Sequence, residues 1–182
     1  MHVIAIANQK GGCGKTTTAI NLSAALGEDG ARVLLIDMDP QGHASLGLGQ
    51  RNPELPGLYE VFTGEADLED VIQEGVAWGV DLVPATVSLA AVEHVLSDRM
   101  ERERQLSRHL EGVAYLYDYV VLDCPPSLGL LAVNALRAAT QVLVPLEASL
   151  YALDGLQRLR EIARLIETRY DLDIPLRLLP VM

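Results

Sequence analysis

The chain has 182 residues, of which 14 are Lys or Arg and 25 are Asp or Glu, so its formal net charge at pH 7 is −11. This length fits one domain with a single core, and 49% apolar against 21% charged residues argues against a disordered chain. The apolar runs are too short to span a bilayer, the N-terminus has no signal-peptide features, and two cysteines cannot build a disulfide framework. We therefore expect a cytoplasmic protein without a membrane segment, whose acidic charge argues against general nucleic-acid binding.

Short apolar runs alternate with segments of helical spacing along the chain. The apolar runs are typical of buried parallel strands, which we expect at residues 3–7, 33–36, 80–83, 120–122, 142–144 and 176–181. The helical spacing predicts helices at residues 16–26, 88–110, 129–139 and 153–166. A long surface loop is expected at residues 50–57, which contain two prolines. Strands separated by helices predict an α/β fold of three layers, α/β/α, around a mostly parallel sheet.

The most specific motif lies between the first predicted strand and the first predicted helix. Its eight residues are Lys10, Gly11, Gly12, Cys13, Gly14, Lys15, Thr16 and Thr17. Glycines allow the backbone to curl so that N–H groups point at phosphate oxygens, and the following helix adds its free N–H groups and its positive dipole end. Lys15 is placed to reach the β- and γ-phosphates of a nucleotide, and the Thr16 hydroxyl is placed to ligate Mg²⁺.

This motif departs from the usual phosphate-loop pattern G-x-x-x-x-G-K-[ST]. Gln9 stands where that pattern has a glycine, and an additional lysine, Lys10, precedes Lys15 by five residues. Cys13 occupies a variable position of the loop. A reactive thiolate at the helix N-terminus is one interpretation of Cys13, and a passive buried side chain is the favoured one.

Two later strands are predicted to end on acidic residues. Asp123 follows a valine- and leucine-rich run in the Walker B arrangement, in which a carboxylate holds the Mg²⁺ shell. Asp37 and Asp39 alternate along an extended segment, so we expect their side chains to point to opposite sides. One of them can face the metal while the other faces the γ-phosphate or a partner, and a carboxylate at that place can position the attacking water.

At these residues the chain resembles the ParA/Soj chromosome- and plasmid-partitioning ATPases, within the ParA/MinD group of deviant Walker A proteins. The resemblance covers essentially the whole chain. It rests on the segments 8–18, 37–42, 123–129, 134–136 and 151–156. It implies that residues 1–182 form a single P-loop ATPase domain that lacks the C-terminal part of the family.

The resemblance also implies a mechanism with ATP and Mg²⁺. ATP is bound by the eight residues of the loop, and two protomers form a homodimer with the nucleotides between them. Lys10 reaches the partner's phosphates, and Lys10, Lys15 and Asp39 are the expected catalytic residues, with Asp39 acting on the attacking water. Thr16 and Asp123 would serve Mg²⁺, and Asp37, one of the alternating acidic residues, is a further expected metal ligand.

The implied partners are a ParB-like protein that stimulates slow turnover and non-specific DNA that serves as the track. The net charge of −11 puts DNA binding by this chain, and so a nucleoid location, in doubt. Chromosome or plasmid partitioning is the favoured function. Two alternatives stay open, namely a related ATPase that positions a protein cargo, and a nucleotide-controlled binding switch without useful turnover.

Overall fold

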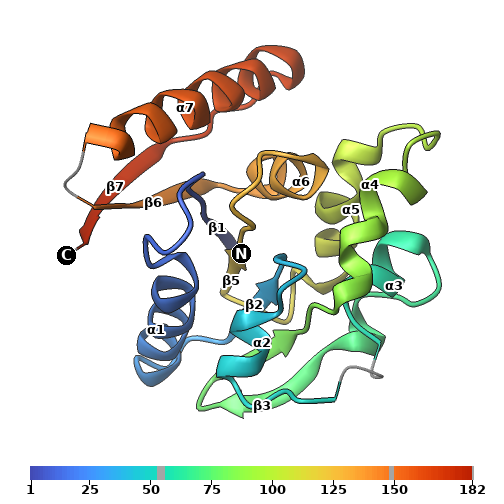
Figure 1. The fold of residues 1–182 in the computed structure, drawn as a ribbon. Coiled ribbons are helices and arrows are strands. Elements are labelled where there is room, and N and C mark those ends of the chain that lie inside the picture. Colours follow the sequence, from blue (N-terminus) through green and yellow to red (C-terminus); the bar gives the residue numbers. More distant parts are fainter. Residues whose placement is uncertain (53–55, 148–149, 182) are drawn as a thin grey trace.

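The computed structural model describes residues 1–52, 56–147 and 150–181 (Figure 1). Seven strands form one sheet in the order β3-β4-β2-β5-β1-β6-β7. The strands are β1 (His2–Ile6), β2 (Val33–Asp37), β3 (Gln73–Ala77), β4 (Val80–Val83), β5 (Tyr119–Asp123), β6 (Gln141–Glu147) and β7 (Leu176–Val181). All neighbouring strands are parallel except the antiparallel pair β3 and β4, which confirms the mostly parallel sheet.

Helices cover both faces of this sheet. The α-helices are α1 (Lys15–Glu28), α2 (His43–Gly47), α3 (Leu58–Thr63), α4 (Val92–Val95), α5 (Gln105–Val113), α6 (Leu130–Ala138) and α7 (Leu150–Tyr170), and the 3-10 helices are η1 (Glu69–Val71), η2 (Val87–Ala91) and η3 (Arg102–Arg104). In β2, Val33 and Leu35 belong to the apolar cluster that includes α1, whereas Leu34 and Ile36 belong to the cluster that includes α3 to α7. Figure 1 shows α1 and α7 on opposite sides of the sheet, which confirms the three layers.

The single helix predicted over residues 88–110 is wrong. The structure divides this segment into η2, α4, η3 and α5. Glu101 has a left-handed φ of 53°, and the Arg99 guanidinium donates hydrogen bonds of 3.2 and 2.6 Å to carbonyl oxygens of α3. One straight helix over this segment would be about 35 Å long, roughly twice the length of a five-residue strand. The chain therefore bends to keep its leucines on the core, and Met100 in the bend is 89% exposed.

The sequence patterns also miss β3, so the strand expected as the third is the fourth along the chain. β3 is an edge strand of mixed composition, and its alternation is interrupted by Gly75, which has a φ of 65°. Trp78 and Gly79 form the two-residue turn between β3 and β4. A glycine in a two-residue turn is a known hairpin signal and was the available clue.

The loop predicted at residues 50–57 includes residues 53–55, which lie outside the described residues; residues 50–52, 56 and 57 belong to no helix or strand. No helix in the described parts of the chain combines the length and the apolar character needed to cross a membrane.

The strand order brings the predicted motifs to one edge of the sheet. β2, β5, β1 and β6 are adjacent and parallel, so the loops that follow them leave from the same side. The register pairs Asp123 with Asp37 on one side and with Ile6 on the other. Ligands in open α/β sheets bind at the carboxyl ends of the strands, and this edge is therefore where the site must be sought.

Candidate functional site

The loop between β1 and α1 forms an open cradle at a helix N-terminus. Gly12 and Gly14 have φ values of 72° and 84°, a conformation that glycine adopts without strain. Gly14 is the N-cap of α1, whose first N–H groups have no acceptor within the helix. A Cβ atom placed on Gly11, Gly12 or Gly14 would meet no protein atom within 4 Å, so the space in front of the loop is open. This arrangement suits an anion such as a phosphate group.

Lys15 and Cys13 stabilise the curl of the loop by bonding to the same carbonyl group. The Lys15 Nζ atom donates to the carbonyl oxygen of Lys10 at 3.2 Å, and the Cys13 Sγ atom donates to that oxygen at 3.1 Å. Both side chains are buried. Cys13 therefore packs inside the loop, as the favoured interpretation has it, and the Lys15 ammonium is held close to the cradle.

Asp123 is a buried carboxylate at the end of β5. Neither of its oxygens has a hydrogen-bond partner among the described residues. Burial raises the pKa of Asp123 to about 7; the nearby charges of Asp37 and Asp39 also raise it, while the Thr16 hydroxyl and the Lys15 ammonium lower it.

An unpartnered buried carboxylate destabilises a protein unless a cation joins it. Carboxylate and hydroxyl oxygens are the ligands that Mg²⁺ prefers, so Asp123 and Thr16 fit such an ion.

Asp37 differs from Asp123 because hydrogen bonds engage both of its oxygens. Oδ1 accepts from the backbone N–H of Asp39 at 3.1 Å, and Oδ2 accepts from the backbone N–H and the hydroxyl of Ser45 at 2.8 and 2.7 Å. Burial raises the pKa of Asp37, and these hydrogen bonds partly offset the rise. The geometry favours a positioning role, in which Asp37 holds the loop that carries Asp39. Direct metal ligation by Asp37 stays a prediction.

Asp39 and the phosphate loop line one hollow at the carboxyl edge of the sheet. Asp39 Oδ1 accepts from the backbone N–H of Gln41 at 3.0 Å, and no partner of Oδ2 is found among the described residues. The hollow is lined by Gly11, Gly12, Gly14, Lys15, Thr16, Thr17, Asp39, Gln41, His43 and Pro126. Gln41 and Pro126 lie inside the segments 37–42 and 123–129 that carry the resemblance but were assigned no site role, and His43 directly follows the first of these segments.

Lys10 is a predicted site residue whose side chain points away from the hollow. It forms an ion pair and a hydrogen bond with the carboxylate of Glu147, the last residue of β6. Sequence reasoning missed Glu147 because 136 residues separate it from Lys10 along the chain. Only the pairing of β1 with β6 brings the two side chains together.

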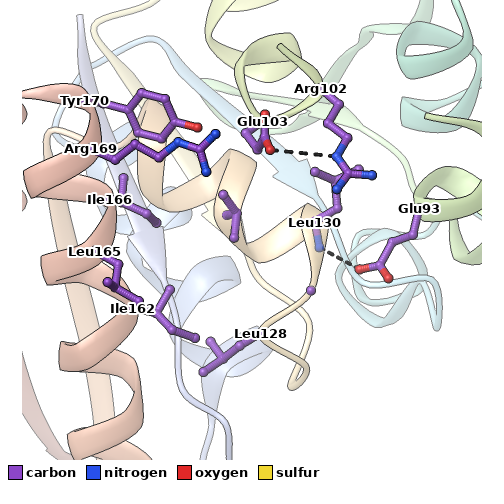
Figure 2. A pocket seen from close by; sticks show the side chains of 12 residues that line it. Glu93, Arg102, Glu103, Leu128, Leu130, Ile162, Leu165, Ile166, Arg169 and Tyr170 are labelled. Atoms are coloured by element: carbon purple, nitrogen blue, oxygen red, sulfur yellow. Dashed lines mark hydrogen bonds and ion pairs between the residues drawn. The ribbon is translucent and has the colours of Figure 1, made fainter. Parts of the chain in front are cut away.

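A second cavity lies between α6 and α7, on the opposite face from α1 (Figure 2). Its apolar lining residues include Leu128, Leu130, Val133, Ile162, Leu165 and Ile166, and charged residues such as Arg102 and Arg169 also line it. Glu93 at its rim accepts a hydrogen bond from the backbone N–H of Leu130 at 2.5 Å, and Arg102 pairs with Glu103 at 3.7 Å. None of the predicted phosphate-binding or metal-binding residues lines this cavity. The candidate site is therefore the hollow at the phosphate loop.

Comparisons with known proteins show which family the chain belongs to. The family model described as an AAA domain matches residues 1–176. The sporulation initiation inhibitor protein Soj of Bacillus subtilis (strain 168) is 45% identical over 173 residues, which are 94% of this chain and 68% of that protein. The chromosome partitioning protein ParA of Myxococcus xanthus (strain DK1622) is 43% identical over 174 residues, which are 95% of this chain and 62% of that protein. The chain thus spans about two thirds of the length of these relatives.

Among solved structures, a cobyrinic acid a,c-diamide synthase from Mycobacterium smegmatis superposes with a TM-score of 0.94 and 39% sequence identity. The superposition covers 99% of this chain and 74% of that protein, which was crystallised with a bound ATP analogue and magnesium.

Proposed function

The chain belongs to the AAA domain family, in the group of the Soj and ParA partitioning ATPases, and from this premise we propose that it is an ATP-dependent, dimerising ATPase that segregates or positions DNA. The observation that carries the proposal is the hollow in which the phosphate loop meets Asp39, with the unpartnered carboxylate of Asp123 close by. The ATP analogue and magnesium bound by the M. smegmatis protein of the same fold support ATP and Mg²⁺ as the ligands.

Nucleotide binding follows from the loop itself. The backbone of Gly11, Gly12 and Gly14 and the N-terminus of α1 bind the phosphates, and Lys15 supplies a positive charge to the β- and γ-phosphates. Thr16 and Asp123 would hold Mg²⁺, which when bound neutralises negative charge on the phosphate oxygens. The buried Asp123 carboxylate favours a bound cation, which supports Mg²⁺ at this place.

Hydrolysis needs a group that holds water in line with the γ-phosphate. Asp39 lines the hollow, and its loop is fixed by the hydrogen bond from its own N–H to Asp37. In the proposed reaction the water oxygen bonds to the γ-phosphorus and loses a proton to solvent, the bond from this phosphorus to the bridging oxygen breaks, and ADP and inorganic phosphate leave. Lys10 of each protomer adds its charge to the phosphates bound by the partner.

Slow basal turnover, a ParB-like stimulatory partner and DNA as a track complete the proposal. These three properties are what membership of the Soj and ParA group implies. Because the chain matches about two thirds of the length of the relatives described above, each of these properties belongs to the proposal and is open to direct measurement.

Calorimetric titration with ATP tests the nucleotide site. Lys15→Ala removes the charge nearest the β- and γ-phosphates, and we expect it to abolish measurable ATP binding by the folded protein. Glu28→Gln, an exposed change at the far end of α1, is the control and should bind ATP as the unmodified protein does. Micromolar ATP affinity in Lys15→Ala, or failure of the unmodified protein to bind ATP, would contradict the proposal.

A further inference from the structure

Lys10 is fixed beside the end of β6 by the buried side chain of Asn8. The Asn8 amide donates to the carbonyl oxygen of Pro145 at 2.7 Å, and its Oδ1 atom accepts from the backbone N–H of Lys10 at 3.2 Å. Gly155 of α7 packs close to Asn8, since a Cβ atom at Gly155 would lie 3.3 Å from Asn8 Oδ1. The start of the loop, the end of β6 and the beginning of α7 are thus packed together.

This packing places the Lys10 ammonium against the carboxylate of Glu147. The two groups form an ion pair, and their side chains are 35% and 49% exposed. Glu147 also lines a hollow with Gly12, Gly14 and Thr17, which are residues of the phosphate cradle. In the nucleotide-free protomer, the charge assigned to a partner's phosphates is therefore neutralised within the same chain.

We infer that Glu147 is an intramolecular counter-ion that holds Lys10 within its own protomer and restrains ATP-dependent dimerisation. The inference rests on the proposed function, because it concerns how the dimer forms. Lys10 reaches the phosphates across the interface only after it exchanges the Glu147 carboxylate for phosphate oxygens. The same carboxylate, at the rim of the cradle, also repels the negatively charged nucleotide.

The size of the restraint follows from the exposure of the pair. A half-exposed ion pair shifts an equilibrium by roughly 1.5- to 5-fold. A symmetric dimer breaks two such pairs, so the dimerisation constant carries this factor twice, about 2- to 30-fold in total. The restraint is small enough for ATP to overcome and large enough to change the monomer–dimer ratio.

Sedimentation of the full chain with ATP and Mg²⁺ tests the inference. Glu147→Gln keeps the shape of the side chain and removes its charge, and we expect it to tighten dimerisation about 2- to 30-fold. Glu28→Gln makes the same charge change on a distant exposed residue and should leave the dimerisation constant unchanged. In a Lys10→Ala background, which we expect to stay monomeric, Glu147→Gln should not restore an ATP-dependent dimer, because the charge that the carboxylate restrains is gone.

A second measurement examines the pair without nucleotide. Modification of the Lys10 amine by an acylating reagent, followed by mass spectrometry, should be about 1.5- to 5-fold faster in Glu147→Gln, because the amine is no longer held in a pair. Unchanged dimerisation in Glu147→Gln beside an ATP-dependent dimer of the unmodified protein overturns the inference alone, as does unchanged labelling. Absence of any ATP-dependent dimer in either protein contradicts the proposed function, and the inference falls with it.

Discussion

At the scale of single residues, the stability of the fold depends on whether a cation binds at Asp123. Its side chain is fully buried, and neither oxygen has a partner among the described residues. The Thr16 hydroxyl and the Lys15 ammonium compensate this charge only in part, so the folded state bears the cost of a partly compensated buried carboxylate when no cation is bound. Within the proposed function, ligand binding and stability oppose each other at this position, as is common in active sites.

Asp123→Asn should stabilise the nucleotide-free protein at neutral pH and should remove the dependence of ATP binding on Mg²⁺. The folded pKa of about 7 lies above the ordinary value of 3.8, so the unfolded chain loses this proton first as the pH rises. The stability of the unmodified protein relative to Asp123→Asn should thus fall between pH 4 and pH 7 and stay constant above pH 7.

Urea unfolding at pH 4, 5.5 and 7.5 measures this difference in the free energy of unfolding. We expect it to grow from almost nothing to a few kcal/mol, with Glu28→Gln as a control that follows the unmodified protein. A variant that is less stable at pH 7.5, or a difference that does not change with pH, would show that Asp123 has a partner in the folded state.

The sequence predicted those candidate-site residues that lie within one local motif. Gly11 to Thr17 lie within one strand–loop–helix unit, where spacing alone fixes their relative positions. The pair of Lys10 and Glu147 and the anchoring of Asp37 by Ser45 depend on which strands are neighbours and on how a short helix docks. Such contacts cannot be predicted from local patterns.

At the scale of elements, buried strands were predictable and edge or bent elements were not. β2 and β5 are apolar on both faces and therefore stand out as continuous apolar runs. β3 is a half-exposed edge strand without such a run. The apolar spacing over residues 88–110 identified five buried residues correctly but wrongly included Met100, which is exposed. Spacing also does not report the bend at Glu101, where the chain changes direction to stay on the sheet.

Helix α7 carries four exposed arginines that lie on two different flanks. Arg160 and Arg164 line a groove beside β7 together with Glu167, whereas Arg169 lies at the cavity between α6 and α7 (Figure 2). Arg158 is 11 residues from Arg169, which is close to three turns, and so shares its flank. This helix therefore offers no continuous basic surface.

We expect weak duplex DNA binding by the nucleotide-free chain. Each flank of α7 can displace counterions from about two phosphates, so log K should fall with log salt concentration with a slope of about −2 or shallower. A fluorescence anisotropy titration over a range of NaCl concentrations measures this slope. Nanomolar affinity with a much steeper slope would place a DNA site on another surface of the chain.

At the scale of the whole molecule, the sheet provides the site and a dimer would complete it. The carboxyl edge gathers the phosphate loop, Asp39 and Asp123 within one protomer, but the Lys10 charge stays with Glu147. Within the proposed function, binding and hydrolysis are therefore separate steps, and different residues limit them. Lys10 acts when two protomers meet, and Asp39 acts on water once both nucleotides are enclosed.

The central claim is that the chain forms an ATP-dependent dimer that hydrolyses its nucleotide. Light scattering of Asp39→Ala with ATP and Mg²⁺ tests this claim most directly. Loss of this carboxylate removes the group that positions water and relieves repulsion of the γ-phosphate, so ATP binding and dimerisation should persist while phosphate release stops. Lys10→Ala, the matched variant, should bind ATP and remain monomeric. The account predicts an Asp39→Ala dimer that accumulates with ATP and not with ADP; an Asp39→Ala protein that stays monomeric with ATP would contradict it.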